Sequence, residues 1–131
     1  MQDDFSTIMT VSASGMRAQG KRLKAVAENL ANVDSPGFRR KQVYFRDSVD
    51  RNSGANTVEV SRVSHDPSPL RTVYEPGHPL ANTDGYVTFS NVNAIIEMMD
   101  MKEAERSFSA GLRTFDQARD MFMRTLDLLR R

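Results

Sequence analysis

The sequence contains no cysteine, which excludes disulfides, thiolate nucleophiles and zinc sites built on thiolates. It has two histidines, His65 and His78, each in a proline-containing, turn-like stretch without a second ligand at metal-binding spacing. Phosphate-binding and dinucleotide-binding glycine loops are missing, as are serine-hydrolase and zinc-protease motifs. We therefore predict no enzyme: no catalytic residue, no metal and no cofactor. A hydrolase that uses His78 is the enzymatic alternative.

Long apolar runs are also missing, so no membrane-spanning segment is expected. The acidic start, Met1–Phe5, has neither the basic nor the apolar region of a secretory signal, which by itself indicates a cytoplasmic protein. The 18 basic residues nearly balance the 17 acidic ones, and we interpret the one basic run, Arg39–Lys41, as a solvated surface. Neither nucleic acid nor a small-molecule substrate is an expected partner.

The 131 residues suffice for one domain. Hydrophobic residues make up 39% of them and the mean hydropathy is -0.52, which predicts a thin core or one shared with partners.

Helical periodicity marks the first 33 residues. Phe5–Val33 has apolar residues at helical spacing, and we expect Asp3 or Asp4 to cap the start of this helix. Gly15 and Gly20 indicate either local fraying or close contact with another helix. Four apolar residues form a seam at intervals of seven: Met9, Met16, Leu23 and Leu30.

A second helix is predicted from residue 94 to the end, with Asn93 as its N-cap. Its seam repeats every seventh residue: Met101, Phe108, Phe115, Phe122 and Leu129. Small residues follow four of these after three positions, and the two helices are expected to pair as a coiled coil. Together they expose more apolar surface than one chain can cover, so we predict an assembling protein.

All five prolines lie between the helices, where short β-branched runs replace the helical pattern. Strands are predicted at residues 42–45, 57–63, 71–74 and 86–89. The sequence therefore predicts a mainly α protein with a small antiparallel β insert. Its parts are an N-terminal axial helix and turn motif at 1–36, a β-rich insert at 37–92 and a C-terminal axial helix at 93–131. The fold of residues 47–68 stays open.

The end of the first helix carries a distinctive motif. Residues 29–40 read NLANVDSPGFRR, which closely resembles the "ANxxTPGY" signature of flagellar axial proteins, the rod and hook family. Ser35 and Phe38 stand where the family commonly has threonine and tyrosine. The residues that carry the resemblance are Asn29, Leu30, Ala31, Asn32, Ser35, Pro36, Gly37 and Phe38.

Two further stretches, 74–87 and 91–101, are similar to the small proximal-rod members of this family, as is the overall length. Ala94 replaces the proline that is common at the first helical position. The segment Ala104–Phe108 resembles the family's "A-x-R-S-Y", with phenylalanine in place of tyrosine.

The resemblance implies a structural subunit of the basal-body rod in the periplasm, exported uncleaved by the flagellar type III apparatus. It implies that the terminal helices pack around a central channel and that the β insert faces outward. The implied partners are the other proximal and distal rod proteins, the MS-ring side of the basal body and the export apparatus. A cytoplasmic helical adaptor and another axial protein of this family are the alternatives.

Overall fold

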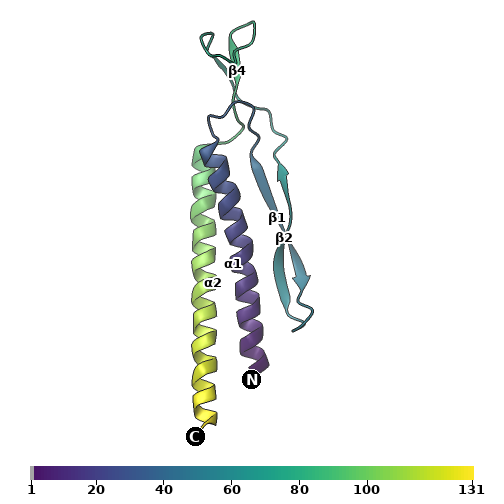
Figure 1. Ribbon diagram of the computed structural model, residues 1–131, viewed down its shortest axis with the longest axis vertical. Helices are drawn as coiled ribbons and strands as arrows, with labels where there is room; N and C mark the ends of the chain where they lie inside the picture. Colours follow the sequence, from purple (N-terminus) through teal and green to yellow (C-terminus); the bar gives the residue numbers. More distant parts are fainter. Residues whose placement is uncertain (1) are drawn as a thin grey trace.

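The computed structural model describes residues 2–131, with side chains from Asp4 onward. Its two long helices, α1 (Gln2–Ala31) and α2 (Ala94–Leu129), lie side by side and run in opposite directions (Figure 1). Between them come four strands in chain order: β1 (Lys41–Val49), β2 (Asn56–His65), β3 (Thr72–Tyr74) and β4 (Tyr86–Thr88). The prediction of a mainly α protein with a small antiparallel β insert is confirmed.

Small residues form the contact between the two helices. Val26 of α1 and Ala104 and Ala118 of α2 are buried, and Gly111 of α2 faces Met16 of α1. Ala18 and Ala25 lie on the other side of α1, beside residues of β1 and β2. Alanine lets two helix axes approach closely, so the larger seam side chains flank this line of contact. At the far end, the ring of Phe5 meets that of Phe122 edge to face, with centroids 6.4 Å apart.

The two helix starts differ from each other. Asn93 caps α2 as predicted, because its side-chain oxygen accepts the backbone N–H of Ile95 at 3.0 Å and of Ile96 at 3.4 Å. The predicted cap of α1 at Asp3 or Asp4 is wrong, because the helix already begins at Gln2. Asp4 therefore lies inside the first turn, where its charge still faces the positive end of the helix.

Close helix contact occurs at one of the small residues that follow the seam residues of the second helix. A Cβ on Gly111 of α2 would lie 3.1 Å from Cγ of Met16, whereas a Cβ on Gly15 or Gly20 would meet nothing within 4 Å. The close-contact interpretation of Gly15 and Gly20 is therefore wrong. Both lie within an unbroken α1.

Residues 47–68, whose fold the sequence left open, complete a hairpin that lies along α1 (Figure 1). β1 pairs with β2 in antiparallel register from Lys41 opposite His65 to Val49 opposite Asn56, with a bulge next to Tyr44. The hydroxyl of Ser14 on α1 accepts the backbone N–H of Val58 at 3.3 Å. Among the described elements, the hairpin packs on α1 and not on α2.

The short strands β3 and β4 form a second antiparallel sheet beyond the helices, at the end of the molecule opposite both termini (Figure 1). Val87 of β4 is buried at its centre. All four predicted strands are present, with boundaries that differ by at most four residues.

The alanine contact generates a stability test. Ala104 is fully buried against α1, so Ala104→Leu forces the helices apart and is expected to lower the free energy of unfolding by about 2 kcal/mol in urea titrations. Ala110 is exposed on the same helix, and Ala110→Leu is the matched control with an expected change within about 0.5 kcal/mol. Equal stability of the two variants would show that the contact is loosely packed.

Candidate functional site

Asn29, at the end of α1, joins this helix to both segments that follow it. Its side chain is fully buried. The Nδ2 group donates to the carbonyl oxygen of Lys41 at 3.0 Å and to Oε2 of Glu97 at 3.2 Å. Its Oδ1 accepts the backbone N–H of Lys41 at 2.8 Å. One amide therefore satisfies both backbone polar groups of the first β1 residue and one oxygen of a buried carboxylate.

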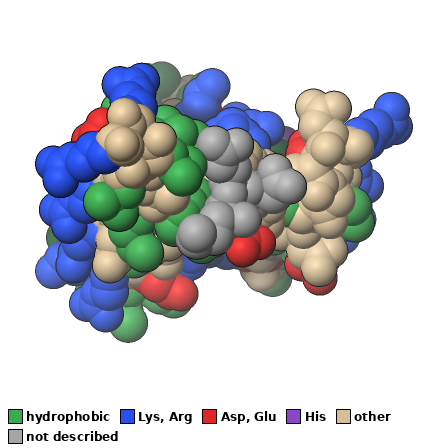
Figure 2. Space-filling view, turned by 90° about the horizontal axis from the view of Figure 1, so that it is seen from below, with side chains coloured by type: hydrophobic (Ala, Val, Ile, Leu, Met, Phe, Trp, Pro, Cys, Tyr) green, Lys and Arg blue, Asp and Glu red, His purple; other side chains and the backbone are tan. Residues whose placement is uncertain are grey.

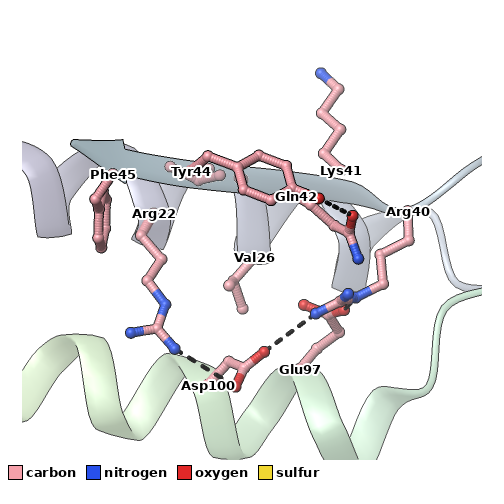
Figure 3. Close-up of a pocket in the computed structure, with 11 residues that line it drawn as sticks. Arg22, Val26, Arg40, Lys41, Gln42, Tyr44, Phe45, Glu97 and Asp100 are labelled. Atoms are coloured by element: carbon pink, nitrogen blue, oxygen red, sulfur yellow. Dashed lines mark hydrogen bonds and ion pairs between the residues drawn. The ribbon is translucent and has the colours of Figure 1, made fainter. Parts of the chain in front are cut away.

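Glu97 and Arg40 form the ion pair at the centre of this junction (Figure 3). Glu97 on α2 is 0% exposed, and the Nε–H of Arg40 donates to its Oε1. The same guanidinium lies 3.2 Å from Oδ2 of Asp100 and 3.7 Å from Oδ2 of Asp66. In Figure 3, Arg40 reaches from the start of β1 toward α2, and Arg22 of α1 approaches Asp100 from the other side.

The carboxylates around Arg40 favour its charged form. Burial alone would lower the pKa of Arg40, but the hydrogen bond to Glu97 and the carboxylates of Glu97, Asp100 and Asp66 outweigh it and raise the pKa above its ordinary value. A buried carboxylate is tolerated when a cation and hydrogen bonds compensate it, and Arg40 and Asn29 supply both.

Asn91, which follows β4, links Arg40 to the loop after β2. Asn91 Oδ1 accepts the backbone N–H of Arg40 at 2.6 Å, and its Nδ2 donates to the carbonyl oxygens of Asp66 and Ser68, each at 3.1 Å. The hydroxyl and backbone N–H of Ser68 bond the Asp66 carboxylate, and with Arg40 they lower the pKa of Asp66 below its ordinary value.

The remaining motif residues shape the chain reversal after α1. Asn32 Nδ2 donates to the carbonyl of Glu28 at 2.8 Å, and Ser35 Oγ donates to Asn32 Oδ1 at 3.0 Å. Gly37 has a φ of 76°, which favours glycine, and its N–H bonds the carbonyl of Thr88 in β4. Within the described residues, the motif therefore acts through conformation and packing. Leu30 and Phe38 are half-buried, while Ala31 and Pro36 are exposed.

The structure places the two predicted seams along the helix pair. Eight of their nine residues are half-buried: Met9, Met16, Leu23, Leu30, Met101, Phe108, Phe115 and Phe122. Leu129 is 73% exposed, because α2 extends past the first turn of α1. Further large apolar side chains are exposed outside the seams on α2, among them Ile95, Met98, Met99, Leu112, Met121 and Met123.

In the part of the chain that the structure describes, neither the cavity beside β1 nor the two histidines form a group of catalytic or metal-binding side chains. A cavity of about 290 Å³ lies between β1 and α2, and the ion-paired side chains of Arg22, Arg40 and Asp100 line it (Figure 3). No metal-binding group of three ligands occurs among residues 2–131, and no described helix is long and apolar enough to cross a membrane. His65 is exposed at the end of β2, and His78 Nδ1 accepts the N–H of Leu80 in a loop.

A long helix pair with exposed apolar side chains, held in shape by a buried ion pair, defines a class: an elongated protein built to pack against others. Comparison with known proteins specifies that class. The model of the family "Flagella basal body rod protein" matches residues 9–39, and "Flagellar basal body rod FlgEFG protein C-terminal" matches residues 83–128.

The chain is 41% identical to the flagellar basal-body rod protein FlgC of Agrobacterium fabrum, over 98% of this chain and 97% of that one. It is 36% identical to FlgC of Salmonella typhimurium, over 92% and 95% of the two chains. FlgC of Buchnera aphidicola from Acyrthosiphon pisum is 37% identical over the same shares. The chain belongs to the FlgC family of flagellar basal-body rod proteins. It is thus a structural component of the basal-body rod.

Sequence reasoning missed the two charged residues on which the junction depends. The interpretation of Arg39–Lys41 as a solvated basic run is wrong for Arg40, because Arg40 pairs with a buried carboxylate. A signal was present: Glu97 lies seven residues before Ala104, at the heptad position of the small buried residues. A charge at a buried heptad position requires a compensating partner from elsewhere in the chain.

The ion pair generates the second prediction. Glu97→Ala leaves Arg40 without its closest anion in a partly buried site, so the free energy of unfolding is expected to fall by about 3 kcal/mol. Urea unfolding measures it, and Glu105→Ala, which removes an exposed carboxylate from the same helix, is the control. Comparable small losses in both variants would contradict a central role for the pair.

The third prediction concerns acid. The lowered pKa of Asp66 means that its contribution to stability is complete above the unfolded value of about 3.9 and is lost as pH falls through the folded pKa. Asp66→Asn is therefore expected to lower stability near neutral pH and to flatten its decline below about pH 4. Unfolding free energies across this range test it, with Asp127→Asn as control. An unchanged acid profile in Asp66→Asn would refute the assignment.

Proposed function

We propose that this chain is a non-catalytic subunit of the proximal segment of the rod, where the rod crosses the periplasm and transmits torque. The observation that carries this is the rigid helix pair, locked to its insert by Asn29, Arg40 and Glu97, in a chain whose FlgC relatives match it nearly end to end. A shaft needs elements that resist bending, and paired helices with packed side chains supply them.

Assembly proceeds through the terminal helices. In a single chain, the pair of helices α1 and α2 leaves large apolar side chains of α2 exposed, among them Leu112 at 44% exposure. Burying such side chains against neighbouring helices is favourable by about 25 cal/mol for each Å² removed from water. The seams of α1 and α2, including Phe108 and Phe115, support this packing from within. The neighbours are other proximal-rod and distal-rod proteins, with the MS-ring side of the basal body below.

Passage to the rod occurs by flagellar type III export. Two features support this. The fully buried core is small and consists mainly of alanine and valine, so the chain opens at low cost. No cysteine is present to cross-link it. In this proposal the helices gain their full stability when they pack in the rod, since amphipathic helices depend on tertiary contacts.

The fourth prediction tests this proposal in bacteria that lack their own copy of the chain. The chain is expected in detergent-purified hook and basal-body complexes by immunoblot, and to be missing from them when flagellar export is disabled. Leu112→Asp places a charge on the outer face of α2 and is expected to reduce its amount there about tenfold or more.

Gln117→Asp adds a charge at an exposed polar position of the same helix and is the matched control, with incorporation unchanged. Both variants should unfold at the same urea concentration as the parent chain. Wild-type protein that remains in the soluble cytoplasm would overturn the rod assignment and favour a helical adaptor. Normal incorporation of Leu112→Asp would show that this face of α2 is not a packing surface.

A further inference from the structure

Methionine is the most readily oxidised side chain in this protein. The sequence contains eight methionines, no cysteine and no tryptophan. Hydrogen peroxide converts a methionine thioether to a sulfoxide, which turns a flexible apolar side chain into a polar one. The effect of oxidation on this chain therefore depends on where its methionines lie.

Four methionines of α2 are exposed to solvent, with exposed fractions of 64%, 53%, 52% and 48%: Met99, Met98, Met123 and Met121. We call these four residues the exposed group. Ile95 and Leu112 of the same helix are exposed as well, so the group belongs to the apolar surface that α2 presents to solvent. Figure 2, which views the end of the molecule where both termini lie, shows hydrophobic side chains on the surface there.

The other methionines whose side chains the structure describes are half-buried in the seams between the helices: Met9, Met16 and Met101. We call them the packed group. Met16 is in close contact with α2, because a Cβ on Gly111 would lie 3.1 Å from its Cγ. Peroxide reaches an exposed thioether more readily than one that is packed against other side chains. The structure thus separates thioethers that react early from thioethers that react late.

We propose that the exposed group is an oxidation-sensitive site that controls whether α2 can pack against other subunits. Hydrogen peroxide transfers one oxygen atom to the sulfur of Met98 or Met99 and leaves as water, so the sulfur is oxidised and the peroxide is reduced. The sulfoxide oxygen loses its hydration when another helix covers it, which makes packing unfavourable. This inference rests on the proposed function and deepens it, because it adds a chemical control to the packing of α2.

Oxidation of the exposed group is expected to leave the fold of the single chain intact. The contact of α2 with α1 is made by other residues, among them Ala104 and Ala118. The start of α2 is held by its cap at Asn93. Sulfoxides at exposed positions keep their bound water, so they change stability little until a neighbour displaces that water. The modification therefore acts on assembly and not on folding.

The control is limited in time and can be reversed. Once neighbouring helices cover α2, its thioethers are no longer in contact with solvent, so peroxide acts on the chain only before it is packed. Methionine sulfoxide reductases return the sulfoxide to the thioether. A chain that was oxidised before assembly can therefore regain its apolar surface.

Limited oxidation of the purified chain tests the selectivity. The chain is treated with hydrogen peroxide and digested, and the sulfoxides are located by mass spectrometry. Met98 and Met99 are expected to react at least about fivefold faster than Met16 and Met101. The urea midpoint of unfolding is expected to stay unchanged when only the exposed group has reacted. Equal rates in the two groups, or a lower midpoint, would overturn the proposal.

Two variants test the effect on assembly. One carries leucine at all four positions of the exposed group, which keeps the apolar surface and removes its thioethers. The control carries leucine at the three positions of the packed group. Each replaces the chromosomal copy in bacteria that build flagella in the presence of hydrogen peroxide. Mass spectrometry of the cellular chain confirms that sulfoxides have formed in the parent.

Peroxide is expected to lower the amount of parent chain in purified basal bodies at least about fivefold. The exposed-group variant should lose less than about twofold, and the packed-group control should respond like the parent. Met98→Gln/Met99→Gln, which is polar without any oxidant, is expected to be depleted in untreated cells as well. Equal losses for the parent and the exposed-group variant would overturn the proposal.

The two proposals fail in different ways. A parent chain that reaches basal bodies in equal amounts with and without peroxide, although its exposed group is oxidised, overturns the oxidation site and leaves the rod assignment intact. A parent chain that is missing from the basal bodies of untreated cells overturns the rod assignment itself, and the control of packing with it.

Discussion

The placement of one carboxylate, Glu97, constrains the rest of this structure. It lies fully buried near the start of α2, so its charge has to be compensated where it is. Arg40 from the start of β1 supplies the cation, and Asn29 from the end of α1 supplies a hydrogen bond. The end of α1 and the start of β1 therefore meet the start of α2 at one point, although Glu97 lies 57 residues after Arg40. From that point the helices run on together, with Gly111 of α2 against Met16 of α1, and the hairpin lies along α1.

Sequence patterns reached the parts of the fold that depend on local periodicity. Heptad spacing located both helices, and turn residues between β-branched runs located the strands, because these signals repeat over neighbouring residues. The sequence patterns did not predict the junction of Asn29, Arg40 and Glu97. Arg40 and Glu97 are 57 residues apart, and nothing local to either one names the other. The start of α1 lies elsewhere than the sequence predicts: Asp4 has the chemistry of a cap, but the helix already begins at Gln2.

The family motif gains a physical meaning from this geometry. Residues that carry the resemblance to axial proteins, such as Asn29 and Gly37, contact their own chain: Asn29 bonds Lys41, and Gly37 bonds β4. They set the direction in which the insert leaves the helices. The large apolar side chains on the outside of α2 have no such partner within the described chain. The motif residues thus fix the conformation of the chain, whereas the exposed side chains of α2 are available for contacts with other proteins.

The hairpin contacts α1 among the described elements and ends in an exposed turn at Asn52–Gly54. This turn lies at the end of the hairpin nearest the chain termini and away from the junction (Figure 1). Extra residues inserted in that turn would lengthen β1 and β2 without shifting the alignment of α1 against α2. The molecule thus combines helices whose lengths are tied to each other with a side branch whose length is free. Residues added there change how far the hairpin reaches along α1 and leave the junction of Asn29, Arg40 and Glu97 in place.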